Sequence, residues 1–274
     1  MCLKKYTFGH IFFHARAYEA LDLQILELKK IYRQKEEEFI KLLGLVRHKI
    51  LDEKYLTLLN TRLFPNFKPH QNDFYIYLTT TNALADSINQ DRLNQIKEDS
   101  FIYQGQMSGK FDLKDLPTQQ SLELKLGAQV MLLNNDMFGR WFNGSIGKIT
   151  YINLDEDLIE IELTDGKIVD VKPFAWEMFQ FNYNEETATI DSESIGSFRQ
   201  FPLRLAWAIT IHKSQGKTFE KVILDIGDGT FAHGQLYVAL SRCTSLDGLI
   251  LKRPIERRHI LLDRSVVEFM REKI

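Results

Sequence analysis

The chain has 274 residues, of which 44% are hydrophobic and 26% are charged, and its formal net charge is −2. This composition is typical of a globular protein with one large or two modest domains, and it restricts any nucleic-acid surface to a local patch. The two cysteines, Cys2 and Cys243, lie at opposite ends of the sequence, which excludes a disulfide framework or zinc motif and indicates a reducing compartment. The sequence contains neither a signal-peptide core nor about 18 consecutive apolar residues, so we expect a soluble, cytoplasmic protein that does not contact the membrane.

The first part of the sequence predicts several helices and two strands. Apolar spacing and β-rich runs predict, in order, a helix over Ala15–Ala20, a strand over Leu23–Leu28, helices over Glu36–Val46 and Asp52–Leu63, and a strand over Phe74–Leu78. The polar run Thr79-Thr80-Thr81-Asn82 follows that strand and leads into a helix that ends at Ile96. Asn82 is the expected N-cap, because its side chain can accept a hydrogen bond from the first turn.

The pattern changes to short strands after about Lys125. Strands are predicted over Val130–Leu133, Gly147–Ile152, Leu158–Leu163 and Lys167–Val171. Turn residues such as Asn143-Gly144 separate them every 8–12 residues or so, which is typical of a small antiparallel barrel. We expect this unit to extend to about Phe198, with Phe174 and Trp176 in its core.

Strands then alternate with helices again. The prediction is a strand over Pro202–Thr210, a strand over Lys221–Asp225, a helix over Gly234–Cys243, a strand over Leu249–Lys252 and a helix over Arg264–Ile274. Such alternation favours an α/β fold with a parallel sheet and helices on both faces. We therefore predict one α/β domain, residues 1–125 plus 199–274, interrupted by a small antiparallel β-barrel over 126–198.

The sequence Gly216-Lys217-Thr218 invites comparison with a phosphate-binding loop. The full motif needs a glycine five positions before Gly216, and Ile211 stands there. Without that first turn the backbone amides cannot surround a triphosphate, so we reject a Walker A site here.

Thr210, His212, Lys213 and Ser214 instead offer hydroxyl, imidazole and ammonium donors at the carboxyl end of a predicted strand. Ligands of open α/β sheets bind at that edge. Short hydroxyl and cationic donors suit contacts to phosphodiesters, which position a nucleic acid without reading its sequence. The alternative is a solvated surface turn, which fits each residue alone better than it fits the cluster.

Two arginines have two interpretations each. Arg242 follows an apolar helix, where it can complement the helix dipole as a solvated cation. It can also act as an arginine finger, a planar cation that stabilises charge on a transferring phosphoryl group. Arg33, in Ile31-Tyr32-Arg33-Gln34, has the same two interpretations.

Two further groups of residues do not point to one function. Arg140 and Trp141, beside the predicted Asn143-Gly144 turn, suit stacking on a single strand, but Trp141 fits the core of the barrel equally well. The histidines His10, His14, His70 and His233 have no metal-ligand spacing, so we expect no metal site.

Taken together, the motifs resemble the C-terminal half of superfamily 1B DNA helicases of the PIF/RecD kind, over essentially the whole chain. Ile31–Gln34 resembles motif IV, Thr79–Asn82 the motif that follows, Thr210–Gly216 motif V, and Gln235–Arg242 motif VI. Leu124–Met131 with Asn143, Gly144 and Gly147 resembles the start of an inserted Src-homology-type barrel. The resemblance therefore implies a second RecA-like domain with that barrel inserted.

The resemblance also implies roles for individual residues. Arg242 is similar to the motif VI arginine finger and Arg33 to the motif IV arginine that senses the γ-phosphate. Gln215 and Gly216 would approach ATP with these arginines. Contacts to single-stranded DNA would come from Thr79, Thr80, Asn82, Thr210, His212, Lys213 and Ser214.

Members of this family carry Walker A, Walker B and the magnesium ligands on a first RecA-like domain, and those motifs are absent from this sequence. We therefore expect the C-terminal portion of an ATP-dependent 5′→3′ DNA helicase, in which ATP and Mg²⁺ both require the missing N-terminal domain. The isolated chain is predicted to lack ATPase activity. Two alternatives stay open: a non-enzymatic module that binds single strands, and one subunit of a split helicase.

Overall fold

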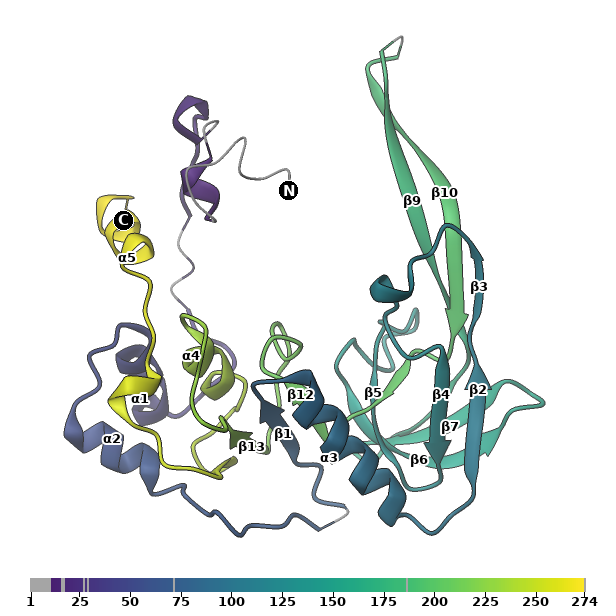
Figure 1. Ribbon diagram of the computed structural model, residues 1–274, viewed down its shortest axis with the longest axis horizontal. Helices are drawn as coiled ribbons and strands as arrows, with labels where there is room; N and C mark the ends of the chain where they lie inside the picture. The colour runs from purple at the N-terminus through teal and green to yellow at the C-terminus, as the bar shows by residue number, and fades with distance from the viewer. Residues whose placement is uncertain are drawn as a thin grey trace. The chain divides into compact units, whose positions relative to one another are not determined.

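The computed structural model describes residues 11–15, 18–26, 28, 30–70, 72–185 and 187–273 (Figure 1). The chain divides into two compact units, one formed by Met1–Tyr32 with Asp263–Ile274 and the other by Arg33–Leu262. Cys2 and His10 lie outside the described residues, as do parts of the segments predicted over Ala15–Ala20 and Leu23–Leu28.

Aromatic side chains contact one another in the smaller unit, although Phe12 remains 65% exposed. The elements of this unit are η2 (Phe12–His14), η3 (Tyr18–Ala20) and α5 (Arg264–Lys273). Phe13 stacks on Phe269 with ring centroids 4.3 Å apart, and Phe12 and Tyr18 meet the same ring edge-on. Four rings thus pack together, with Phe269 of α5 at their centre.

The strand predicted over Leu23–Leu28 is wrong for the residues described there. None of them belongs to a strand, and Leu26 and Leu28 are 85% and 87% exposed. An apolar run becomes a strand only where a partner strand and a covering layer are available.

A four-stranded parallel sheet lies at the centre of the larger unit. Its strands, in spatial order, are β12 (Ala208–Thr210), β1 (Ile76–Thr79), β13 (Val222–Asp225) and β14 (Leu249–Leu251). Every residue of β12 and β14 is buried, as expected when layers cover both faces of a parallel sheet. The α/β fold class predicted from the sequence is confirmed.

Helices cover this sheet. They are α1 (Glu37–Arg47), α2 (Glu53–Asn60), α3 (Asn82–Gln95) and α4 (Gln235–Leu240), with the short helix η5 (Arg257–His259). Side chains of α1, α2 and α4 share one hydrophobic core with β1, β13 and β14. Helix α3 packs against β12 and β1 (Figure 1).

Two caps show how these helices begin. The Asp52 carboxylate accepts a hydrogen bond from the Tyr55 amide at 2.9 Å, so α2 begins just after Asp52, as the sequence predicts. The N-cap of α3 is Thr81, not Asn82, because Thr81 keeps an extended backbone and its hydroxyl accepts from the Leu84 amide. Asn82 is therefore the first residue of the helix, with its side chain exposed.

The antiparallel part follows α3 in the chain. Its elements are β2 (Ser100–Gln104), β3 (Gln106–Gly109), η4 (Leu113–Asp115), β4 (Ser121–Lys125), β5 (Gln129–Leu132), β6 (Ile146–Asn153), β7 (Leu158–Leu163), β8 (Ile168–Val171), β9 (Phe174–Asn184), β10 (Thr189–Gln200) and β11 (Leu203–Leu205). Strands β5 to β8 match the predicted ones, and with β11 they form a five-stranded sheet in the order β11-β5-β6-β7-β8. This sheet has its own hydrophobic core, which includes Trp141, Ile149 and Phe201.

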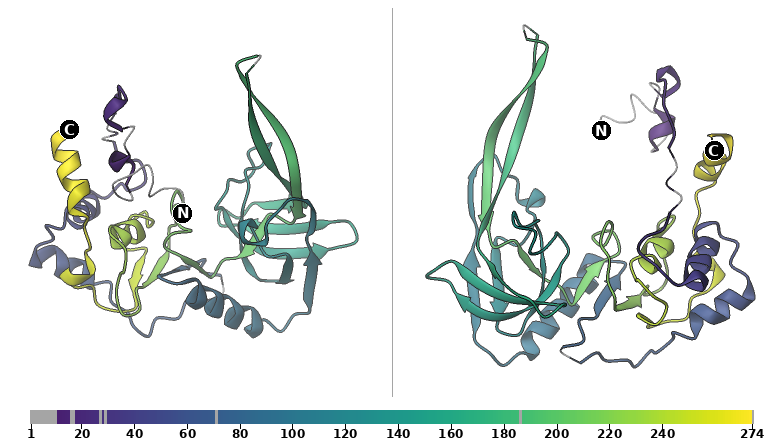
Figure 2. Two further views of the ribbon diagram at one scale, coloured as in Figure 1. Left: turned by 45° about the horizontal axis from the view of Figure 1, so that its top comes forward. Right: turned by 180° about the vertical axis from the view of Figure 1, so that it is seen from behind.

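Strands β9 and β10 form a long twisted ribbon (Figure 2). Directly paired residues lie on the same face, and Phe181 pairs with Ser192 while Tyr183 pairs with Ile190. Phe181, Tyr183 and Ile190 are 68%, 65% and 70% exposed, so these apolar side chains of the outer ribbon face solvent. At the base of the ribbon, Phe174 is 39% exposed, so its predicted place in the core is wrong.

The segment Pro202–Thr210, predicted as one strand, is two strands in different sheets. β11 pairs with β5 in the antiparallel sheet, and β12 pairs with β1 in the parallel sheet. Between them, the Ala206 amide donates to the Gln129 carbonyl at 3.0 Å and the Trp207 carbonyl accepts from the Tyr77 amide at 2.8 Å. Because the β-rich run is continuous, the sequence does not show where the strand changes its partner. The division of the chain into three parts stays a prediction.

Candidate functional site

The carboxyl ends of β1 and β12 bring two predicted polar segments together. Thr79 is in register with Thr210, and the Ile211 amide donates to the Thr79 carbonyl at 2.9 Å. Because the strands are parallel, both segments leave the sheet at one edge. The predicted DNA contacts that gather there are Thr79, Thr80, Asn82, Thr210, His212, Lys213 and Ser214.

These side chains differ in exposure. Asn82, His212 and Lys213 are exposed and Thr80 is half-buried, whereas Thr79, Thr210 and Ser214 are buried. The Ser214 hydroxyl donates to the Ile211 carbonyl at 2.6 Å, and the Thr79 hydroxyl donates to the Thr81 carbonyl at 3.0 Å. The buried hydroxyls thus stabilise the two turns, and the exposed groups are free to meet a ligand.

Gln215 and Gly216, predicted to approach ATP, are exposed in the turn that follows. The Gln215 amide donates to the His212 carbonyl at 3.1 Å, and the Lys217 amide donates to the Ser214 carbonyl at 3.0 Å. Gly216 has φ +78°, a left-handed conformation that glycine adopts without a steric cost. The turn therefore needs glycine for its backbone.

Arg33 and Gln34 connect this turn to the end of α4. The Arg33 Nε donates to the Thr218 hydroxyl at 2.7 Å, and its Nη1 donates to the Ser241 carbonyl at 3.1 Å. The Gln34 amide is buried and donates to the carbonyls of Ser241 and Cys243 at 3.0 and 2.7 Å. The segment that resembles motif IV is thereby bound to the segment that resembles motif VI, and to Thr218, which lies two residues after the segment that resembles motif V.

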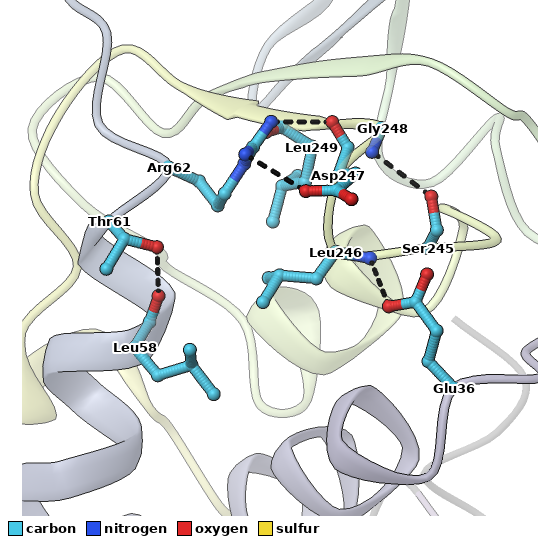
Figure 3. Close-up of polar contacts among 9 residues, drawn as sticks. All are labelled: Glu36, Leu58, Thr61, Arg62, Ser245, Leu246, Asp247, Gly248 and Leu249. Atoms are coloured by element: carbon cyan, nitrogen blue, oxygen red, sulfur yellow. Dashed lines mark hydrogen bonds and ion pairs between the residues drawn. The ribbon is translucent and has the colours of Figure 1, made fainter.

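The loop after α4 is fixed from two further directions (Figure 3). The Glu36 carboxylate accepts from the Leu246 amide at 3.2 Å. The Arg62 guanidinium donates to the carbonyls of Leu249 and Asp247 at 2.9 and 2.6 Å. These contacts hold residues 246–249, which follow Arg242 in the chain.

Arg242 is only 9% exposed, and three acceptors orient its guanidinium. Nε donates to the Val238 carbonyl at 3.0 Å, Nη1 to the Lys217 carbonyl at 3.2 Å and Nη2 to the Ser241 hydroxyl at 2.9 Å. All three acceptors are neutral, so they hold the group without neutralising it.

Arg33 and Arg242 form a pair of adjacent cations. Burial lowers the pKa of Arg242, and the positive charge of Arg33 lowers it further. Within the described part of the chain, no carboxylate lies within 4.0 Å of either guanidinium. Two planar cations without a carboxylate suit an anion with several charged oxygens, such as a phosphate chain.

The other predicted pair, Arg140 and Trp141, is occupied within the antiparallel unit. Arg140 forms an ion pair with Asp136 at 2.8 Å, which lowers the pKa of Asp136 to about 2. Trp141 is 5% exposed, donates to the Asn134 side chain at 3.1 Å and lies beneath the Arg140 guanidinium. The indole ring is in the core, which is the alternative that the sequence left open.

Three residues that contact or adjoin the predicted site residues are absent from the sequence prediction. The only sequence signal for Gln34 is its position next to Arg33. Lys217 donates to the Asn143 side chain at 2.8 Å and also provides the carbonyl that holds Arg242. Arg204 lines a groove next to Lys213, and its signal is a cation inside an apolar run just before motif V.

Neither a metal cluster nor a membrane span occurs among the described residues. They contain no group of three or more His, Cys, Asp or Glu side chains that could hold a metal ion. None of their helices combines the length and hydropathy needed to cross a bilayer.

Comparison with known proteins shows what the whole chain is similar to. A family profile described as "UvrD-like helicase C-terminal domain" matches residues 205–246. The ATP-dependent DNA helicase Pif1 of Campylobacter jejuni is 30% identical over 258 residues, which cover 88% of this chain. Among solved structures, Bacteroides sp. Pif1 in complex with ADP-AlF4 is 35% identical, covers 98% of this chain and superposes with a TM-score of 0.86. Bacteroides Pif1 bound to ssDNA is also 35% identical over 98% of the chain, with a TM-score of 0.71.

The chain spans only part of these proteins. It covers 57% of the Campylobacter protein and 61% of each of the two Bacteroides chains.

Proposed function

We propose that the chain is the second RecA-like domain, with an inserted barrel, of an ATP-dependent 5′→3′ DNA helicase, because it is similar to Pif1 DNA helicases over most of its length and residues 205–246 match a helicase C-terminal domain. In this proposal the phosphate-binding loop and the magnesium ligands belong to a first RecA-like domain, on the same gene product or on a separate subunit. The ADP-AlF4 and ssDNA complexes named for the Bacteroides relatives support ATP and single-stranded DNA as ligands.

The pair Arg33–Arg242 is the observation that carries the proposal. Both guanidinium groups are anchored on Ser241, and neither has a described carboxylate partner. Bound ATP with Mg²⁺ supplies the phosphoryl group that is transferred to water. Arg242 acts as the arginine finger, since its fixed orientation places positive charge where charge develops on phosphoryl oxygens. Arg33 senses the γ-phosphate from the neighbouring position.

The turn Thr210–Gly216 links this pair to DNA. Its first residues lie at the sheet edge with Thr80 and Asn82, and its end adjoins Lys217 and Thr218, which bind the two arginines. A change in the position of either arginine therefore moves the turn that contacts the strand. Cycles of closure and opening between the two RecA-like domains would convert this linkage into stepping along DNA.

The test measures ATP hydrolysis stimulated by single-stranded DNA, using the helicase that contains both RecA-like domains. We expect Arg242→Ala to lower kcat by about 10³-fold, in line with the loss of an arginine finger, and Arg140→Ala to leave it unchanged. The 274-residue chain alone is expected to hydrolyse no ATP.

Two outcomes would contradict the proposal. ATP turnover by the chain alone that Arg242→Ala abolishes would show a complete active site in this chain. Full ATPase activity of the Arg242→Ala helicase would show that Arg242 is not an arginine finger.

A further inference from the structure

A groove opens beside the sheet edge, between α3, the β11–β12 segment and the loop at 112–119. Its volume is about 370 Å³, and its lining includes Asn82, Asp86, Gln90, Thr118, Arg204 and Lys213. Asn82 and Lys213 belong to the proposed DNA-contacting set. The groove is therefore continuous with the edge where a strand would lie.

The groove contains two cations whose charges are not paired. Within the described part of the chain, no carboxylate lies within 4.0 Å of the Arg204 guanidinium or the Lys213 ammonium. Among the described residues, the Arg204 side chain makes one hydrogen bond, from Nη2 to the Pro117 carbonyl at 3.2 Å. That bond leaves most of its five N–H donors available to a ligand.

The wall that holds Arg204 is itself anchored. The buried Thr118 hydroxyl donates to the Leu203 carbonyl at 2.5 Å, so the loop is fixed on β11 next to Arg204. In β11, Arg204 is in register with Met131 of β5. The guanidinium thus extends from a fixed strand into the groove.

The electrostatics agree with this geometry. Burial lowers the pKa of Arg204, while the charge of Asp86 opposes the effect. Burial lowers the pKa of Lys213, and the positive charge of Arg204 lowers it further. The cations therefore destabilise each other until an anion enters, and Asp86 offsets part of that repulsion without forming an ion pair.

We propose that Arg204 and Lys213 form a binding subsite for a phosphodiester of single-stranded nucleic acid, which enters the groove beside the exposed face of Asn82. The subsite rests on the proposed function and extends its DNA path from the sheet edge into this groove. No aromatic side chain is among the described residues that line the groove, so no base can stack there. The subsite binds the strand by its backbone and is indifferent to base sequence.

Binding of a fluorescein-labelled oligothymidylate to the chain tests the subsite, by anisotropy over a series of NaCl concentrations. Arg204→Gln is expected to raise Kd about tenfold, since a hydrogen-bonded charged contact is lost. The slope of log Kd against log salt should fall by about 0.7, the value for one phosphate of a single strand. An oligoadenylate should show the same change.

Two variants complete the design. Arg92→Gln is the matched control, because Arg92 lines a different groove on the same helix α3, and it should change neither quantity. Asp86→Asn removes the opposing charge and should lower Kd about twofold to threefold at low salt. Melting temperatures and circular dichroism verify that each variant is folded, and Arg204→Lys should recover part of the affinity.

The results separate the two proposals. If the chain binds DNA and Arg204→Gln behaves like Arg92→Gln, the subsite is overturned and the helicase proposal stands. If inorganic phosphate competes with the strand to the same extent in wild type and Arg204→Gln, the subsite is likewise overturned. Failure of the wild-type chain to bind any strand also overturns it, whereas the proposed function is judged separately by the ATPase of the two-domain helicase.

Discussion

The pair Arg33–Arg242 and the pair Arg204–Lys213 differ in how firmly their side chains are held. Arg242 donates to three acceptors and Arg33 to two. Arg204 donates to one acceptor, and the Lys213 side chain extends from an exposed turn. A fixed pair suits one anion in one geometry, as catalysis requires. A loosely held pair suits a polyanion that must slide past, so the difference in support separates the two proposed tasks.

The largest expected effect comes from Arg242→Lys. A lysine keeps the charge, but it cannot donate to Val238, Lys217 and Ser241 while also meeting a phosphate, because it lacks the planar fork. We expect kcat of the two-domain helicase to fall by about 10²-fold or more with little change in KM for ATP. Steady-state kinetics at several ATP concentrations would measure both quantities. A kcat within about twofold of wild type would show that the fixed geometry of Arg242 is not required for catalysis, which contradicts the proposed difference between the two pairs.

A smaller effect is expected from Gln34→Leu. The substitution leaves the buried carbonyls of Ser241 and Cys243 without this donor, which costs about 1–3 kcal/mol of unfolding free energy. Urea denaturation of the chain measures that loss. Gln90→Leu, on the exposed surface of α3, is the matched control and should change stability by less than about 0.5 kcal/mol. Equal stability of the two variants would show that Gln34 does not support the fixed pair.

The smallest effect is expected from Lys213→Arg. Because the ammonium is held by no fixed acceptor in the described structure, another cation can replace it, and Kd for an oligothymidylate should stay within about twofold. Lys213→Gln should raise Kd about fivefold, since it removes one phosphate contact. If Lys213→Arg is tolerated and Arg242→Lys is not, the proposed difference between the loosely held and the firmly held pair is supported. If both substitutions are equally damaging, that difference is contradicted.

Local sequence patterns are sufficient to predict the strands and turns that carry the candidate site. The strand at Val222–Asp225 and the donor-rich turn after Thr210 both follow from runs of apolar residues that end in polar ones. The structure agrees with them because each element satisfies its own hydrophobic and turn requirements. The same logic placed β5 to β8, where alternation and turn residues act together.

Local sequence patterns cannot predict contacts between residues that lie far apart in the chain. Gln34 bonds to residues more than 200 positions away, and nothing in its neighbourhood indicates that partner. The division of Pro202–Thr210 into two strands depends on Gln129 and Tyr77, which lie on different sheets. Arg204 acquires its proposed role only because the loop at Pro117 and Thr118 covers β11.

The short crossing between β11 and β12 limits how the molecule can be divided. Only Ala206 and Trp207 separate the two strands, and both are hydrogen-bonded to neighbouring strands through their backbones. A cut or an inserted linker there would break ladders in both sheets at once. A protein engineer who wishes to remove or exchange the antiparallel unit must therefore carry residues 203–210 as one indivisible piece.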